Sequence, residues 1–533
     1  MITKYLKKMI PAAAVVLSFG VTSCVGDLDV TPIDPSTNMT ADANGLFNKC
    51  YANLGIVGQK GANGGDVDIQ GLDGGTTSLI RQLFNANELP TDESICCWGD
   101  EGVSAFNYGQ WTASHPMLRG LYYRLYFGIS VCNQYLATNE GHDATMTAEV
   151  RFLRALYYYY LMDCYGNVPF TTVISSENPE QISRADLYAW IEDELVNKCL
   201  PDMSEPTAKT SASEGYGRAD KAAAWMLLSR LYLNAEVYTG TPQWQKAADY
   251  AKLVIDSPHK LFTEGNGTYS AYRMMFMGDN GENGSSVEAL LPVLQDGVKT
   301  TDWGASMFMI AGTFKSDETP GRGTTETWAG NRARKEFVEK FFPNDNCPSG
   351  TTAEILAAAG DDRALLYSKG RKLDISDVGE FTDGYTVSKF TNVYASGGTS
   401  HSSQFVDTDF FLMRSAEAYL TYAEATARLA GTGNTTPEGT AYVNELRTRA
   451  HAATQSVYSL DQLCDEWSRE FYYEGRRRMD LIRFGKFGGN SDYRWQWKGG
   501  TMAGTNFDSH YNLFAIPETD LNANSNLKQN PGF

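Results

Sequence analysis

Three tryptophans, Trp98, Trp303 and Trp328, stand in segments that are rich in Gly, Thr and Asp and carry no helical period. An indole ring covers the apolar C–H face of a pyranose sugar well, while the edge hydroxyls of the sugar need fixed hydrogen-bond donors and acceptors. The alternative for any single tryptophan is a place in the core, which we favour for Trp190 and Trp225 because both fall on helical apolar stripes. The first three lie on no such stripe, so a role in stacking on a ligand stays open for them.

A second set of chemically capable side chains lies in the turn at 279–284. Asp279, Asn280 and Asn283 offer oxygen atoms close together in sequence, and Glu288 follows. Calcium prefers such hard oxygen ligands. The spacing differs from that of an EF-hand, so a plain surface turn is the alternative to a structural calcium site. No cofactor is required by any pattern in the chain.

The segment 466–483 is dense in Arg and Glu and invites a catalytic interpretation. At helical spacing, however, Glu466, Arg469 and Glu470 are neighbours, and the same holds for the charged residues of 474–478. A structural network of ion pairs explains these residues without any chemistry. We therefore predict that this cluster supports the fold.

Enzyme motifs are missing from the sequence as a whole. There is no nucleophilic-serine motif, no H-E-x-x-H zinc motif and no P-loop. A glycoside hydrolase needs only two carboxylates about 5–10 Å apart. Among 64 acidic residues some pair always meets that distance, so such a pair is no evidence by itself. We predict that the protein is not an enzyme.

The N-terminal residues predict an export signal and an anchor. Lys4, Lys7 and Lys8 precede a short apolar run at 12–19, which is the pattern of a signal peptide over 1–23. The run ends in Val-Thr-Ser before Cys24, and this resembles a bacterial lipobox whose cysteine takes the lipid. An ordinary signal peptide with a nearby cysteine is the alternative. No later stretch has 18 consecutive apolar residues, so membrane attachment is expected through the lipid alone.

The net charge and the cysteine spacing argue against two kinds of binding partner, nucleic acid and structural zinc. The 45 basic and 64 acidic residues give a formal charge of −19, which makes a nucleic-acid partner improbable. Eight cysteines follow Cys24 without a CxxC pair, so a structural zinc site is improbable as well. Disulfide connectivity cannot be deduced from the spacing.

The elements that must position the tryptophans are predominantly helical. Apolar residues recur with helical period over 148–165, 218–236 and 409–430, and capping signals stand at Ser183 and Ser459. Paired helices with short turns and small contact residues are typical of tetratricopeptide-like hairpins. We predict one mainly α domain over 24–533, with helical scaffold at 120–258 and 405–487. Gly- and Asn-rich loops with short strands are expected over about 55–115 and 259–400.

Three long motifs, at 149–169, 466–485 and 516–533, resemble the SusD/RagB family of surface lipoproteins. They occur in the family's order, and with the lipobox they span essentially the whole chain. The resemblance implies a tetratricopeptide-like scaffold that carries an irregular binding part. It also implies a location on the outer face of the outer membrane. There the protein would capture a glycan and deliver it, uncleaved, to a TonB-dependent transporter of the SusC type.

Segments 71–98, 295–304 and 323–328 are locally similar to the starch-binding member of this family. The similarity implies that Trp98, Trp303 and Trp328 form one aromatic platform, with Asp73 and Arg81 bonding sugar hydroxyls. Two departures stand out: Cys96 replaces a further aromatic residue, and Glu101 replaces an asparagine. They leave chain length and linkage open.

The expected ligand is a starch-type α-glucan. A different glycan, or a peptide, is the alternative within the family. A glycoside hydrolase is the less favoured alternative outside it.

Overall fold

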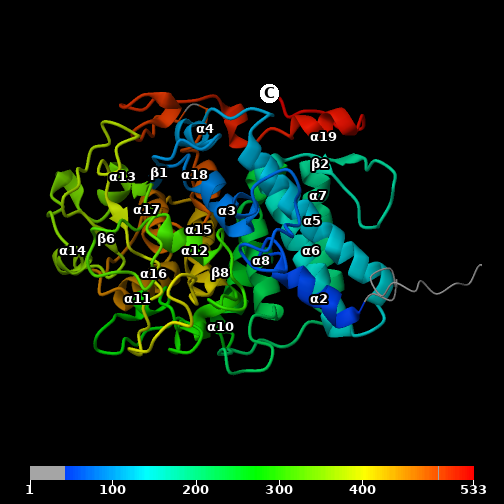
Figure 1. Ribbon diagram of the computed structural model, residues 1–533, viewed down its shortest axis with the longest axis horizontal. Coiled ribbons are helices and arrows are strands. Elements are labelled where there is room, and N and C mark those ends of the chain that lie inside the picture. The colour runs from blue at the N-terminus through cyan, green and yellow to red at the C-terminus, as the bar shows by residue number, and fades with distance from the viewer. Residues whose placement is uncertain (1–41, 490) are drawn as a thin grey trace, which may run out of the picture. The chain divides into compact units, whose positions relative to one another are not determined.

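The computed structural model describes residues 42–489 and 491–533 (Figure 1). The chain divides into two units, Met1–Gly45 and Leu46–Phe533, and apart from residues 43–45 all that follows concerns the second. The predicted signal peptide, 1–23, and Cys24 lie outside the described residues. None of the helices described is both long and apolar enough to cross a membrane.

Helices form most of the regular structure. The longer ones are α2 (Ala43–Ala52), α3 (Leu79–Asn87), α5 (Pro116–Asn139), α6 (Ala144–Tyr165), α7 (Arg184–Asp193), α8 (Lys221–Leu233), α10 (Trp244–Asp256), α14 (Thr352–Ala359), α15 (Ala416–Ala430), α16 (Pro437–Arg449) and α17 (Leu460–Phe471). The shorter ones are α4 (Val103–Tyr108), α9 (Ala235–Thr239), α11 (Ala271–Met274), α12 (Ser306–Ala311), α13 (Lys335–Val338), α18 (Arg477–Arg483) and α19 (Glu518–Ala523).

The scaffold consists of helices packed in pairs. α5 lies beside α6, α10 packs against both α8 and α15, and α15 packs against α16 (Figure 1). The predicted end of the 148–165 helix is confirmed, because the N–H of Gly166 donates to the carbonyl of Met162 at the end of α6. The predicted caps are confirmed too, with Ser183 capping α7 and Ser459 forming a capping box with Gln462 at α17. The mainly α fold class is as predicted.

The described part of the chain also holds four antiparallel strand pairs: β1 (Ser94–Cys96) with β5 (Asn331–Ala333), β2 (Val168–Pro169) with β3 (Gln181–Ile182), β4 (Ala289–Val293) with β8 (Phe410–Arg414), and β6 (Leu366–Tyr367) with β7 (Thr386–Val387). The prediction of one helix over 409–430 is wrong at its start, because β8 precedes α15. All of β8 is buried, and a short run that is buried on every side shows no period that distinguishes strand from helix.

Buried arginines stabilise the loop-rich parts by donating hydrogen bonds to backbone carbonyls. The buried guanidinium of Arg334 donates to the carbonyls of Ser94 (2.7 Å), Leu89 (3.0 Å) and Asn107 (2.9 Å), and to that of Gln496. One side chain thus joins β1, the end of α4 and a C-terminal segment. Because irregular backbone offers few partners of its own, such contacts hold these loops in a single arrangement. The eight cysteines from Cys50 onwards are free thiols.

Candidate functional site

Asp73, Arg81 and Trp303 converge on the short turn at Gly75, just before α3. A Cβ atom on Gly75 would lie 3.0 Å from Cβ of Trp303, 3.4 Å from Oδ1 of Asp73 and 3.7 Å from Nη1 of Arg81. Only glycine leaves that space free. Residues more than 200 positions apart in the sequence therefore lie close together at this turn.

The indole rings of Trp303 and Trp328 lie next to each other, and a third ring joins them. Their ring centroids are 5.8 Å apart with an interplanar angle of 50°, and the ring of Phe405 is 4.7 Å from that of Trp303. The sequence analysis missed Phe405. It stands in a Ser- and Gly-rich segment without a period, so the criterion that selected the tryptophans could have found it.

Both indole N–H groups have hydrogen-bond partners that fix the rings. Nε1 of Trp328 donates to Oε2 of Glu326 (2.7 Å), and the second oxygen of this carboxylate accepts from Nε2 of Gln404 (2.8 Å). Nε1 of Trp303 donates to Oδ1 of Asn63 (3.3 Å). The rings are half-buried, so each keeps part of its surface open to solvent. Held rings lose little entropy when a ligand stacks on them.

Trp98 lies on the other side of Arg81. The guanidinium carbon of Arg81 is 5.8 Å from the Trp98 ring centroid and 4.9 Å from that of Phe308. The Trp98 indole packs directly on Gly330, which has a φ of +102°; a Cβ there would lie 2.2 Å from Nε1 of Trp98. Trp98 is also half-buried, and it makes no direct ring contact with Trp303 or Trp328 within the 7 Å typical of aromatic pairs.

Arg81 differs from the other buried arginines because its guanidinium pairs with no residue that the structure describes. The residue is 9% exposed, and its Nε atom is buried without a hydrogen-bond partner. Burial lowers the pKa of Arg81, and the carboxylates of Asp100 and Asp73 oppose that effect from nearby. A buried donor without an acceptor is costly, so this group is a natural donor to a ligand hydroxyl.

Asp73 is exposed and helps to hold the turn at Gly75. Its Oδ1 accepts from the backbone N–H of Thr76 (3.2 Å), and its carbonyl accepts from the Thr76 hydroxyl. The other carboxylate oxygen of Asp73 has no hydrogen-bond partner among the described residues, and the carboxylate lies near Arg81. The pair supplies an acceptor and a donor together, which suits adjacent sugar hydroxyls.

The buried carboxylate of Asp302 sets the position of Trp303. It accepts from the backbone N–H groups of Gly304 (2.6 Å) and Val57 (3.1 Å). Burial raises the pKa of Asp302 to about 6, although these two N–H groups favour the ionised form. Protonation of Asp302 is therefore linked to the backbone that carries a candidate ring.

The five predicted site residues, Asp73, Arg81, Trp98, Trp303 and Trp328, thus lie in one region; together with Phe405 we call them the candidate site. Their rings form two groups, one at Trp98 and one at Trp303, joined by Arg81, instead of one continuous stack.

The two departures from the starch-binding pattern lie beside Trp98. Cys96 is buried in β1, where its backbone pairs with Asn331, while Glu101 is exposed just before α4. Neither side chain adds a ring or an amide to the candidate site. Burial raises the pKa of the Cys96 thiol to about 12, so this group stays neutral.

The three residues proposed for calcium are already engaged in hydrogen bonds. The carboxylate of Asp279 accepts from the backbone N–H groups of Ala395 (2.8 Å) and Ser396 (2.9 Å). The side-chain amides of Asn280 and Asn283 donate to backbone carbonyls, and their oxygens accept from backbone N–H groups. The calcium site stays a prediction, since the turn is held without one.

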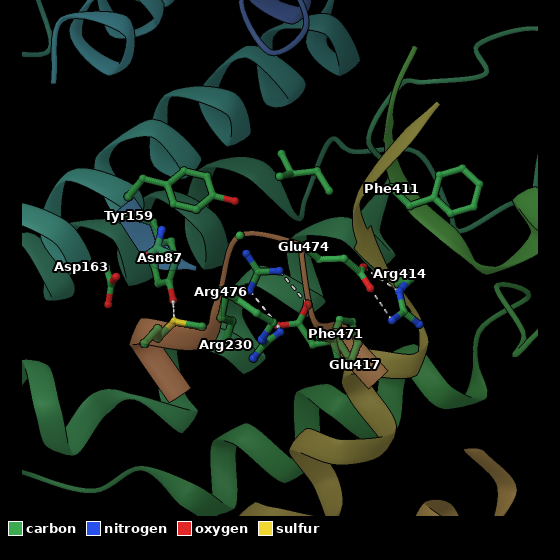
Figure 2. A pocket seen from close by; sticks show the side chains of 14 residues that line it. Asn87, Tyr159, Asp163, Arg230, Phe411, Arg414, Glu417, Phe471, Glu474 and Arg476 are labelled. Atoms are coloured by element: carbon green, nitrogen blue, oxygen red, sulfur yellow. Dashed lines mark hydrogen bonds and ion pairs between the residues drawn. The ribbon is translucent and has the colours of Figure 1, made fainter. Parts of the chain in front are cut away.

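The charged cluster of 466–483 is a buried network of ion pairs around a cavity of only about 30 Å³ (Figure 2). Arg230 pairs with Glu417, Arg414 pairs with Glu474, and Arg476 also reaches Glu417. Because the charges in this cavity satisfy one another, it offers no open chemistry to a substrate.

The structure supports a structural role for this cluster but corrects its pairing. Arg469 does pair with Glu466 within α17 (2.9 Å). Arg476 and Arg483 also pair locally, both with Asp480 of α18 (3.0 and 2.9 Å). Arg477 and Arg478 instead form tertiary pairs, with Asp92 (2.7 Å) and Asp163 (2.5 Å). Gly475 and the break between α17 and α18 remove the continuous helix that local pairing would need.

Comparison with known proteins extends this picture. Residues 273–533 match the family model described as SusD family, and residues 91–233 match the model described as starch-binding, associating with outer membrane. Over its full length the chain is 41% identical to the starch-binding protein SusD of Bacteroides thetaiotaomicron, with 100% of both chains covered. The chain belongs to the SusD family. Proteins of this family bind glycans without cleaving them and are associated with the outer membrane, so the predicted family and the non-enzymatic role are confirmed.

More distant relatives and solved structures agree. A SusD-like protein, P25, of Formosa agariphila is 25% identical, with 68% of this chain and 69% of that protein covered. The crystal structure of a SusD superfamily protein from Parabacteroides distasonis has a TM-score of 0.65 at 21% identity and covers 92% of this chain and 98% of that one. The surface glycan-binding protein A of Bacteroides thetaiotaomicron, solved with laminarihexaose, has a TM-score of 0.64 at 20% identity and the same coverage. These structures share the fold.

Proposed function

We propose that the protein captures starch-type α-glucans at the candidate site and does not cleave them. The observation that carries the proposal is the guanidinium of Arg81. It pairs with none of the described residues, lies over the Trp98 ring and is close to the turn at Gly75 that Trp303 also contacts. Rings supply the surface for the sugar faces, and Arg81 with Asp73 supplies the polar contacts. The full-length similarity to starch-binding SusD supports the α-glucan as the class of ligand.

Calorimetric titration with maltoheptaose, with a cyclic α-glucan and with a β-linked glucan tests this proposal. We expect binding of both α-glucans and weak or no binding of the β-glucan. Equal binding of the β-glucan would contradict the α-linkage preference. Binding of a peptide pool in place of any glycan would favour the family's alternative class of ligand. Reducing ends should not accumulate on incubation with malto-oligosaccharides.

We further propose that Cys24 carries the lipid that anchors the protein on the outer face of the outer membrane. The lipobox-like residues before Cys24 and the family's association with that membrane support this. In the Cys24→Ala variant we expect a folded protein that binds glycan but no longer partitions with outer membranes. Retention of that variant in membranes, with no transporter present, would contradict the anchor.

The proposed partner is a SusC-type TonB-dependent transporter, which would receive the captured glycan. Family resemblance supports this partner. We expect the protein to co-purify with a TonB-dependent β-barrel from detergent-solubilised outer membranes. Recovery of the protein without any barrel would contradict the proposal.

A further inference from the structure

A hollow is lined on one side by Trp98, and no other residue of the candidate site lines it. Its volume is about 410 Å³, and it is lined by Trp98, Tyr108, Trp497 and residues of β1, α4 and the loop 376–379. We call it the Trp98 pocket. Its size falls in the range of about 300–1,000 Å³ that is typical of small-molecule sites.

The Trp98 pocket has an aromatic wall and a polar rim. The rings of Tyr108 and Trp497 lie 5.9 Å apart with an interplanar angle of 40°. Ser104, Ser376 and Asp377 are exposed around the opening and present hydroxyl and carboxylate oxygens. A face of rings with a rim of hydroxyl-bonding groups is the chemistry that suits a sugar.

The pocket is rigid because each of its walls is tied to the core. Asn107 of α4 exchanges two hydrogen bonds with the backbone of Cys96 (3.0 and 2.7 Å). Nη2 of the buried Arg332 donates to the carbonyl of Val378 (2.7 Å), which holds the loop 376–379. Nε1 of Trp497 donates to the carbonyl of Ile375 (2.8 Å), so the third wall is fixed to that same loop.

The composition of the lining selects the class of occupant. No Lys or Arg lines the pocket, so an anionic ligand would find no counter-charge there. The exposed polar rim does not suit a lipid. Trp98 belongs both to this pocket and to the candidate site, where Arg81 lies over its ring. Because the same ring belongs to both, a glycan stacked on Trp98 would have the pocket beside it.

We propose that the Trp98 pocket is a second subsite that holds further sugars of the same α-glucan chain, so that long chains bind more tightly than short ones. This inference rests on the proposed function, because it names the continuation of the same ligand. Tyr108 and Trp497 would stack on the additional sugars, and the oxygens of Ser104 and Asp377 would bond their hydroxyls.

The test compares maltotriose with a maltodextrin of about 15 glucose units by calorimetric titration. Tyr108→Ala removes one ring, and Ser104→Trp fills the pocket from the exposed face of α4. Both variants should bind the long chain five- to tenfold more weakly and maltotriose as the parent does. Tyr108→Phe keeps the ring and should behave as the parent. Tyr250→Ala, which removes a ring from a hollow between α7 and α10, is the matched control and should leave both affinities unchanged.

The outcomes separate the two claims. If the parent binds neither chain, the proposed function fails and this subsite fails with it. If the parent binds both chains while Tyr108→Ala and Ser104→Trp leave the long-chain affinity unchanged, only the subsite is overturned. A loss that is equal for maltotriose and the long chain, or a loss that Tyr250→Ala shares, also overturns it.

Discussion

Arg81 in the candidate site and Arg414 in the buried cluster both lie over aromatic rings, yet their surroundings differ. Arg414 lies 3.9 Å from the Phe471 ring centroid and binds the carboxylates of Glu288 (3.0 Å), Glu470 (2.7 Å) and Glu474 (2.8 Å). Arg81 lies 4.9 Å from the Phe308 ring centroid and bonds to none of the residues that the structure describes.

The two arginines show that a buried arginine can either stabilise the fold or remain available to bind a ligand. A buried charge with all its partners supplied from within contributes to a unique fold. A buried charge whose partners are missing leaves a donor available, and in a region of half-buried rings that donor suits a ligand. The number of arginines by itself would not distinguish the candidate site from the buried ion-pair cluster.

The largest effect is expected from removing the rings. Replacing Trp98, Trp303 and Trp328 with Ala together should abolish α-glucan binding, because each ring–sugar stack contributes on the order of 1–2 kcal/mol. Each single variant should bind about tenfold more weakly. Titration with maltoheptaose measures both, after circular dichroism confirms the helical content. If the triple variant binds as the parent does, the glycan site lies elsewhere.

A change in the buried cluster should lower stability and leave the site intact. Glu470 contacts three guanidinium groups, those of Arg363, Arg414 and Arg449, and they hold its pKa well below the usual range although burial acts to raise it. Glu470→Gln leaves these cations short of one negative charge. We expect a loss of about 3–5 kcal/mol in the free energy of unfolding, measured with denaturant.

The matched control for that measurement is Glu205→Gln, which breaks an exposed pair with Lys221. Exposed pairs contribute little, so the control should stay within about 0.5 kcal/mol of the parent. Equal stability of Glu470→Gln and the control would show that the cluster is not needed for the fold.

Arg81 should show the reverse behaviour. Arg81→Met keeps an unbranched side chain but removes the charge, so glycan binding should weaken about tenfold through the lost charge-assisted hydrogen bond. Stability should remain equal or rise, because an unpaired buried charge disappears. Denaturant unfolding measures the stability of the variant, and titration with maltoheptaose on the same sample measures its affinity for the glycan. A marked loss of stability with unchanged binding would place Arg81 with the structural arginines.

Asp302 should make stability depend on pH in the region of Trp303. Its pKa is raised by burial to about 6, above the usual value of 3.8, so the folded state binds the proton more tightly than the unfolded state. This contribution is fully present below about pH 4 and is lost as the pH rises through 6. Relative to Asp302→Asn, the parent should gain on the order of 2–3 kcal/mol as the pH falls from 7 to 4. Thermal unfolding at several pH values measures this difference, and parallel curves would contradict it.

The smallest effect is expected from calcium. The oxygens of Asp279, Asn280 and Asn283 already accept backbone N–H groups, so a bound ion would have to compete with these bonds. We expect that adding calcium to a chelator-treated sample raises the melting temperature by no more than about 2 °C. A rise of about 10 °C that Asp279→Asn abolishes would show a structural calcium site.

Local sequence patterns determined the helices and their ends. Ser183, Ser459 and Gly166 act on backbone groups within one helical turn, so their effects could be predicted without any tertiary contact. The family could be identified from the sequence for a similar reason, because each of its motifs is a continuous stretch of residues. The tryptophans of the candidate site were selected by the family resemblance, and their place in aperiodic, Gly-rich segments argued against a helical core position.

Tertiary structure alone decided which groups meet. The pairing of Asp92 with Arg477, the contact of Phe405 with Trp303 and the burial of β8 each join segments that lie about 100 or more residues apart. Spacing carries no information about such contacts, because they depend on how the whole chain packs. The same packing buried Arg81 and gave its guanidinium no partner among residues 42–489 and 491–533, which its residue type could not reveal.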